Sequence, residues 1–120
     1  MKFLNIDLEI TSRRRPAKLL ADFAGQVLVL HDGKVVGGYL TAVELCSCPK
    51  TESKVLARIL SLLAGLSKEG RAELAIAKIK RLDFGYSKAK GERCEHTFKP
   101  AVLRAISDLG CELAFTIYED

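Results

Sequence analysis

The sequence predicts an α+β fold, a two-layer sandwich in which helices cover one face of a mixed five-stranded sheet. Two observations indicate it. Segments of strictly alternating apolar and polar residues open and close the chain, as in half-buried strands, and segments with apolar residues at helical spacing lie between them. The expected element order is βαββααβαβ. At 120 residues and 48% hydrophobic, the chain suits one domain over residues 1–120.

The first strand is expected in FLNIDLEI, residues 3–10. Its apolar residues occupy every second position from Leu4 to Ile10, which places Asn5, Asp7 and Glu9 on the opposite face. Such a pattern is typical of a strand with one face on the core and the other in water.

A helix and a hairpin follow. Pro16 suits the first turn of a short helix over residues 16–24. Asp32-Gly33, between two apolar runs, predicts a two-residue turn, and the second hairpin strand is expected over residues 34–46. The Gly37-Gly38 pair inside that strand predicts a bulge or the close approach of another backbone.

The middle of the chain is predicted to be helical. A broad apolar stripe runs from Val55 to Leu66, wide enough to pack on a sheet. Ser67 can cap a second helix over residues 68–81, where the apolar spacing is less regular. The two segments can form a helical hairpin or one bent helix, and we favour the hairpin.

The C-terminal third predicts a strand, a helix and a strand. RLDFGYS, residues 81–87, alternates, and a basic loop follows it. Thr97 can cap a helix that has Pro100 in its first turn and ends at Gly110. In the last strand Cys111, Leu113, Phe115 and Ile117 alternate with Glu112, Ala114, Thr116 and Tyr118. One face of the sheet is thus left polar, open to solvent or to a partner.

Composition limits the kinds of partner that the protein can be expected to bind and its expected location in the cell. The net charge of +4 is too small to predict nucleic-acid binding, which usually comes with a concentrated basic face. The apolar run in MKFLNIDLEI is broken by charges, which argues against a signal peptide, and no apolar stretch is long enough for a membrane span. Four cysteines are too few for a disulfide scaffold, so we expect a cytoplasmic protein with reduced thiols.

Two cysteine-containing segments raise the question of a zinc site. Cys46 and Cys48 stand one residue apart, as do Cys94 and His96, and the four would make a Cys3His set. Zinc motifs favour two to four residues between paired ligands, however, and Pro49 can turn the second thiol away. The alternative, which we prefer, is that Cys46 and Cys111 are core residues. No resident cofactor is then expected.

Two further groups of residues could bind or react. Arg13, Arg14, Arg15 and Lys18 precede or open a helix and could hold phosphates of a nucleic acid or another anion, although no aromatic residues interleave with them for stacking. Asp83, Glu44, His31 and His96 could supply acid–base chemistry if the fold brought them together. No nucleophile elbow, phosphate loop or HExxH motif accompanies them. Catalysis is therefore not favoured.

The polar face of the sheet offers the remaining candidate site. It should carry Asp7, Glu9, Glu112, Thr116 and Tyr118, an acidic surface with one aromatic residue that could bind a basic protein. The competing interpretation is that these residues only keep the open face soluble. A homodimer is also compatible with the sequence.

The C-terminal third resembles a known family. RLDFGYS, the basic loop, TFKPAVLRAISDLG and CELAFTIYED are similar in order and character to a family of small bacterial domains of unknown function, some of them thought to be immunity proteins that neutralise a toxin. About 40 residues carry the resemblance, above all Leu109-Gly110 and Tyr118. It implies the fold, a bacterial source and a protein partner, and it assigns no catalytic residue.

Overall fold

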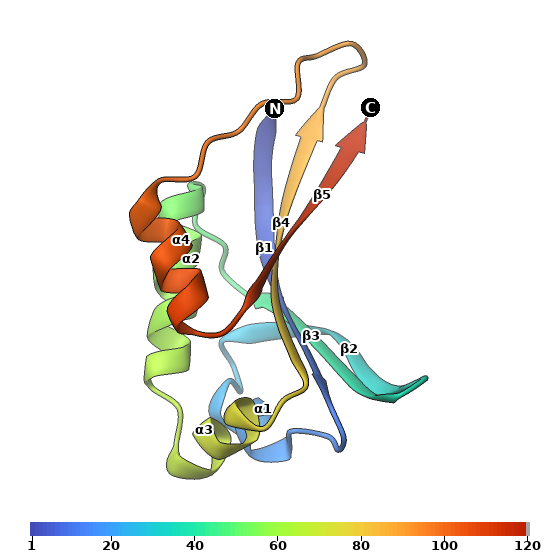
Figure 1. Cartoon of the computed structure of the whole chain (residues 1–120), viewed down its shortest axis with the longest axis vertical. Coiled ribbons are helices and arrows are strands. Elements are labelled where there is room, and N and C mark those ends of the chain that lie inside the picture. The colour runs from blue at the N-terminus through green and yellow to red at the C-terminus, as the bar shows by residue number, and fades with distance from the viewer. Residues whose placement is uncertain (120) are drawn as a thin grey trace.

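One five-stranded sheet with helices on a single face makes up the computed structural model, which describes residues 1–119 (Figure 1). The element order is the predicted βαββααβαβ, and the α+β prediction is confirmed. The elements are β1 (Lys2–Ser12), α1 (Ala17–Asp22), β2 (Val27–Val35), β3 (Gly38–Leu45), α2 (Glu52–Ala64), α3 (Lys68–Ala75), β4 (Ile79–Lys88), α4 (Pro100–Asp108) and β5 (Glu112–Glu119).

The first strand of the chain lies at the centre of the sheet. The strand order is β2-β3-β1-β4-β5, and every neighbouring pair is antiparallel except β4 and β5, which are parallel. Two parallel strands cannot be joined by a tight turn, so the chain between them makes a crossover that includes α4. The sheet is therefore mixed, as predicted.

The core lies between the sheet and the helices. On β1 the side chains of Ile6, Leu8 and Ile10 are buried, in agreement with the alternating pattern. Leu4 was expected on the same face but is 41% exposed, because a bulge between Phe3 and Asn5 shifts the register and turns Leu4 to the open side. The other buried apolar residues are Leu19, Phe23, Ala42, Val43, Leu45, Val55, Leu56, Ile59, Leu63, Leu66, Leu82, Phe84, Tyr86 and Ile106.

The hairpin turn differs from the predicted one. Asp32-Gly33 lies within β2, and the turn is formed by Val36 and Gly37, with Val35 paired to Gly38. Gly37 has φ 88°, a left-handed conformation that favours glycine over residues with a side chain. The hairpin bulge lies between Val29 and His31 instead of at the glycines. Gly38 does meet another backbone, as predicted, because a Cβ there would lie 2.6 Å from the Ser12 carbonyl oxygen.

The two middle helices are separate and do not form the expected hairpin. Thr51 caps α2, and Ser67 caps α3 as predicted, accepting a hydrogen bond from the Gly70 N–H at 3.0 Å. The second helix ends at Ala75 instead of reaching residue 81, and it packs against α1. Asp22 at the end of α1 accepts hydrogen bonds from the Ser67 N–H and hydroxyl, which fixes α3 beside α1.

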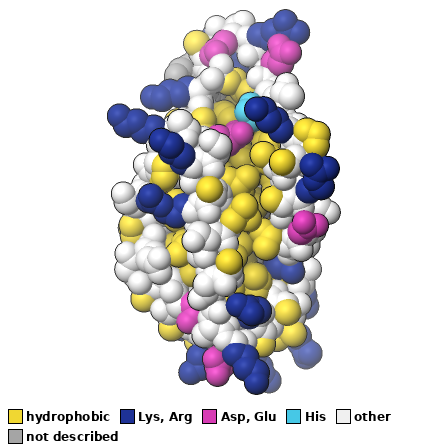
Figure 2. Space-filling view, turned by 90° about the vertical axis from the view of Figure 1, so that its left-hand side faces the viewer, with side chains coloured by type: hydrophobic (Ala, Val, Ile, Leu, Met, Phe, Trp, Pro, Cys, Tyr) yellow, Lys and Arg dark blue, Asp and Glu magenta, His cyan; other side chains and the backbone are white. Residues whose placement is uncertain are grey.

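The helical face is the one that Figure 2 presents. Apolar side chains show in a strip down this face, bordered by Lys and Arg. The last helix begins after Lys99, two residues later than the predicted cap at Thr97, with Pro100 in its first turn as expected. Among residues 1–119, no helix is both long and apolar enough to cross a membrane.

Candidate functional site

The open face of the sheet holds a depression lined by carboxylates. Asp7 of β1 pairs across the sheet with Asp83 of β4, and Glu44 reaches the same place from β3. We call this the acidic depression. It encloses about 190 Å³ and is lined by Leu4, Asn5, Asp7, Glu44, Asp83, Gly85, Thr116 and Tyr118.

Neutral donors hold two of the three carboxylates in place. The Asn5 side-chain amide donates to Glu44 at 2.7 Å. The Thr116 hydroxyl donates to Asp83 and lies 2.9 Å from both of its carboxylate oxygens. Neutral partners position the carboxylates without cancelling their charge.

No cationic side chain among residues 1–119 neutralises the acidic depression. Within residues 1–119, none of the three carboxylates forms an ion pair with Lys, Arg or His. The neighbouring Arg81 is engaged elsewhere, at 3.7 Å from Glu9 and 2.9 Å from Glu112. The depression therefore presents a concentrated negative charge on the open face.

The electrostatics of Asp7 reflect this crowding. Burial of its carboxyl group raises its pKa from the ordinary 3.8 to about 6, and the negative charges of Glu44 and Asp83 add to the effect. A hydrogen bond with Glu44 further favours the protonated form. Asp7 is thus a carboxyl group that ionises at a cost and would gain from a nearby cation.

The structure gathers most of the predicted open-face residues at or beside this depression. Asp7, Thr116 and Tyr118 line it, while Glu9 and Glu112 are not part of its lining and form ion pairs with Arg81. The sequence identified Glu44 and Asp83 only as members of an acid–base set. Their place beside Asp7 depends on cross-strand register, which no local motif encodes.

The two histidines of that acid–base set lie away from the acidic depression. His31 is exposed on β2, where it pairs with Ala42. His96 lies in the loop before α4, with its Nε2 3.1 Å from the Glu52 carboxylate at the start of α2. The acid–base set is therefore not assembled.

His96 belongs to an aromatic cluster that holds the loop before α4 on the sheet. Its ring centroid lies 4.6 Å from that of Phe98 and 5.0 Å from that of Tyr86. The Tyr86 hydroxyl donates to Glu52, the same carboxylate that His96 contacts. Burial, and then the hydrogen bond to Glu52, raise the pKa of Tyr86 above its ordinary value. These contacts give His96 a structural role.

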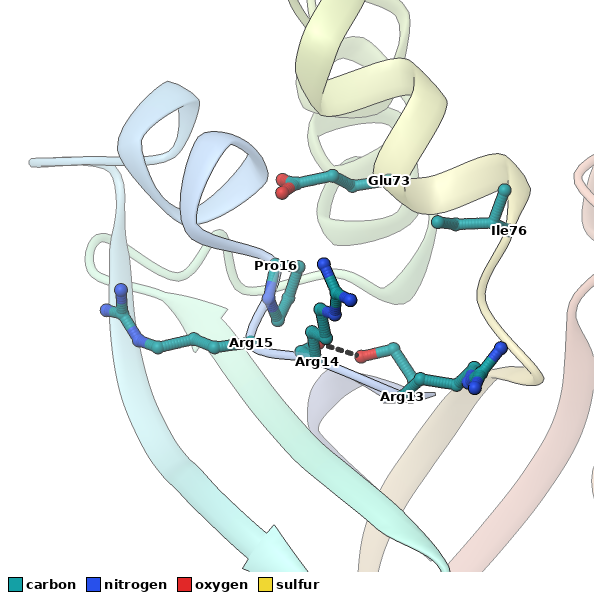
Figure 3. Close-up of a pocket in the computed structure, with 7 residues that line it drawn as sticks. Arg13, Arg14, Arg15, Pro16, Glu73 and Ile76 are labelled. Carbon is teal, nitrogen blue, oxygen red and sulfur yellow. Dashed lines mark hydrogen bonds between the residues drawn. The ribbon is translucent and has the colours of Figure 1, made fainter.

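The arginines predicted to bind anions line a second pocket, which encloses about 390 Å³ between the end of β1 and α3 (Figure 3). Arg14 extends toward Glu73, Arg13 extends toward the side of Ile76, and Arg15 points the opposite way (Figure 3). We call this the arginine pocket. Its lining residues are Ser12, Arg13, Arg14, Arg15, Pro16, Glu73 and Ile76.

The four predicted basic residues do not act as one group. Arg15 is engaged with Asp32, its Nε lying 3.1 Å from both carboxylate oxygens, and the pKa of Asp32 is lowered by this bond. Lys18 is exposed and is not part of the pocket lining. Arg13 and Arg14 form no ion pair within the described residues 1–119.

The residues of the predicted zinc set are engaged separately. The Cys48 thiol lies 3.1 Å from the Asn5 side-chain oxygen, and the Cys94 sulfur lies 3.6 Å from that of Met1. Cys46 is exposed, so it is not the core residue that we expected; Leu45 before it is buried instead. In the part of the chain described, no three His, Cys, Asp or Glu residues are placed to hold a metal ion.

Cys111, which was expected to be a core residue, does pack against the core. It is partly buried, and burial raises the pKa of its thiol. Burial, and then the charge of Glu44, also raise the pKa of Cys48. Neither thiol is activated for nucleophilic chemistry.

Comparison with known proteins gives no relative: no protein-family model, curated protein or solved structure matches the chain.

Proposed function

We propose that this chain is a non-catalytic protein-binding module whose acidic depression receives a Lys or Arg side chain of a partner protein. The observation that carries the proposal is that Asp7, Glu44 and Asp83 lie together in one depression without an ion-pair partner in residues 1–119. Burial, and then the charges of Glu44 and Asp83, raise the pKa of Asp7 to about 6. A bound cation would favour the ionised form of Asp7 and interact with all three carboxylates.

The shape and the walls of the acidic depression fit one basic side chain. The volume of about 190 Å³ is small for a cofactor. Leu4 and Tyr118 supply apolar walls beside the carboxylates, and Lys and Arg carry an apolar stem below the charged head. Because phosphates would be repelled here, the partner of this face is a protein with a basic surface and not a nucleic acid.

The proposal is compatible with the resemblance to small bacterial domains. An immunity-like role requires a surface complementary to a toxin, and proteins that act on nucleic acids carry basic surfaces. Free thiols at all four cysteines accord with a cytoplasmic location. The function would then be to occupy a basic site on the partner.

Binding studies with charge-neutral variants test the proposal. The partner is captured from the source cell with the wild-type chain, and its affinity is measured by calorimetry for Glu44→Gln/Asp83→Asn. Losing two charge-assisted contacts should weaken binding by roughly ten- to a hundredfold or more. The matched control Glu69→Gln/Asp108→Asn removes the same charge from exposed helical positions and should change affinity less than about threefold.

Two results would contradict the proposal. One is equal weakening by both double variants, which would reduce the effect to net charge. The other is that every protein captured by the wild-type chain is captured equally well by the Glu44→Gln/Asp83→Asn variant.

Anion binding at the arginine pocket is a second candidate function, because Arg13 and Arg14 line about 390 Å³ without an ion-pair partner in residues 1–119. Its test is a titration with inorganic phosphate and with a single-stranded oligonucleotide at low salt. Arg13→Gln/Arg14→Gln should abolish binding, whereas Lys50→Gln/Lys54→Gln on another exposed surface should not. Unchanged binding in the arginine variant would dispose of this candidate.

A further inference from the structure

The outer strand β2 has an unpaired, apolar edge. It is the first strand in the sheet order, and among residues 1–119 only β3 pairs with it (Figure 1). Leu28, Val29 and Leu30 are each about half exposed, at 49%, 50% and 50%. Edge strands are usually protected from pairing with another chain by charges, prolines or bulges. Residues 27–29 carry no charge or proline, and the bulge of β2 follows them, between Val29 and His31.

A trench beside this edge is lined by small apolar side chains together with exposed polar groups. It lies between β2 and α1 and encloses about 440 Å³. Its one charged lining residue, Arg15, is neutralised by Asp32 of the same chain. The trench therefore offers an occupant apolar side chains and polar backbone groups, with no uncompensated charge. The lining residues are Arg15, Ala17, Leu20, Ala21, Ala24, Gly25, Val27 and Val29.

The backbone of β2 determines which groups a further strand could reach. The Cys46 N–H donates to the Gln26 carbonyl at 3.1 Å, so this pair is hydrogen-bonded. Antiparallel ladders alternate, which makes Leu28 the next residue bonded to β3, through Glu44. The N–H and C=O groups of Val27 and Val29 therefore point outward, symmetrically about Leu28.

We propose that a second copy of this chain pairs with β2 in antiparallel fashion, with the two-fold axis at Leu28. In this register Val27 hydrogen-bonds to Val29 of the second copy, and Leu28 lies opposite its own counterpart. The arrangement satisfies the outward backbone groups of both copies with the same residues, as an isologous interface requires. It also continues the two sheets into one.

The side chains explain why the occupant is a second copy. Val27 and Val29 lie on the helical face, so the valines of a paired strand would extend over α1 into the trench. Each copy thereby places uncharged side chains against the apolar side chains that line the trench of the other copy. Ala17, Ala21 and Ala24 are exposed and small, which leaves space for these valines. The interface borders the acidic depression, because Leu28 pairs within the sheet with Glu44. The mass of the chain is measured without any partner protein, so it tests the dimer independently of the proposed function.

Mass measurement gives the first test. Analytical ultracentrifugation of the wild-type chain should give twice the protomer mass of 13.2 kDa. Val29→Lys should give the protomer mass with an unchanged circular-dichroism spectrum. If Val29→Lys does not fold, Leu28→Lys takes its place, with the same expected result. A wild-type monomer at several hundred micromolar, or a folded lysine variant that stays dimeric, would overturn the proposal.

Disulfide trapping tests the register. In a background with all four cysteines changed to serine, Leu28→Cys should form a covalent dimer under mild oxidation, since facing residues of a non-hydrogen-bonded pair lie about 4.5 Å apart at Cα. Leu30→Cys is the matched control, equally exposed but opposite Gln26 of the second copy. It should trap at least tenfold less dimer. Equal trapping of the two variants, or no trapping at Leu28→Cys, would overturn the register and with it the interface.

Discussion

Replacing Asp7 with Asn should stabilise the protein at neutral pH. The pKa of Asp7 rises from 3.8 to about 6 on folding. Full linkage would make the ionised carboxyl cost roughly 3 kcal/mol of folding free energy. Because the group is partly open to solvent on the sheet surface, screening reduces this, and we expect about 1 kcal/mol. An Asn amide removes the charge and can still donate to Glu44.

The pH dependence distinguishes this cause from others. A raised pKa means that the folded state holds its proton to a higher pH than the unfolded chain, so the contribution of Asp7 to stability is largest below about pH 4 and is lost as the pH rises to about 6. Above that range this contribution is constant. The advantage of Asp7→Asn should therefore be near zero at about pH 4 and complete by about pH 7.5.

Urea unfolding at these two pH values measures the effect. Asp108→Asn, at an exposed position on α4, is the control and should change the free energy of unfolding by less than about 0.5 kcal/mol at either pH. If Asp7→Asn destabilises at neutral pH, or if its advantage is the same at both pH values, the electrostatic account of the acidic depression is wrong.

Three other substitutions probe the fold, each measured by urea unfolding. Gly38→Ala should cost about 2 kcal/mol or more, because its Cβ would lie 2.6 Å from a backbone oxygen of β1; Gly25→Ala, with φ 80° and open space, should cost only about 1 kcal/mol, and equal costs would contradict the clash. Thr41→Val should stabilise by about 1 kcal/mol, since the buried hydroxyl has no hydrogen-bond partner among residues 1–119; a loss would show that the hydroxyl is satisfied. Tyr86→Phe should cost about 1–2 kcal/mol by removing a hydrogen bond to a carboxylate on α2, and a neutral effect would refute that bond.

Local patterns were enough to predict most of the fold. The alternation in β1 encodes a half-buried strand directly, and Ser67 caps α3 where the sequence indicated. A strand also forms where the sequence predicted β5, but its expected core face is not buried, since Phe115 and Ile117 are 51% and 40% exposed at the edge of the sheet. The hairpin was misplaced because two glycine-containing turns competed within one segment. The turn forms at Gly37, which adopts the left-handed conformation that the turn requires. Asp32 lies within the strand, where its carboxylate accepts hydrogen bonds from Arg15 and Tyr39.

The candidate site was only partly predictable, for a physical reason. Alternation shows which residues of one strand share a face, so Asp7 and Tyr118 could be assigned to the open face. It does not show which residues of different strands stand side by side, because register is set by tertiary pairing. Glu44 and Asp83 therefore joined Asp7 only in the structure.

The parallel pairing of β5 with β4 has a consequence for folding. The central strand is made first, yet one wall of the acidic depression comes from Thr116 and Tyr118, near the end of the chain. A parallel strand pairs only after its crossover has closed, which is a slow kind of step. Asp83 receives the Thr116 hydroxyl at that moment and not before. A chain in which β5 has not yet been made therefore carries an incomplete acidic depression. Under the proposed function, a partner protein would be bound only after the whole sheet has formed.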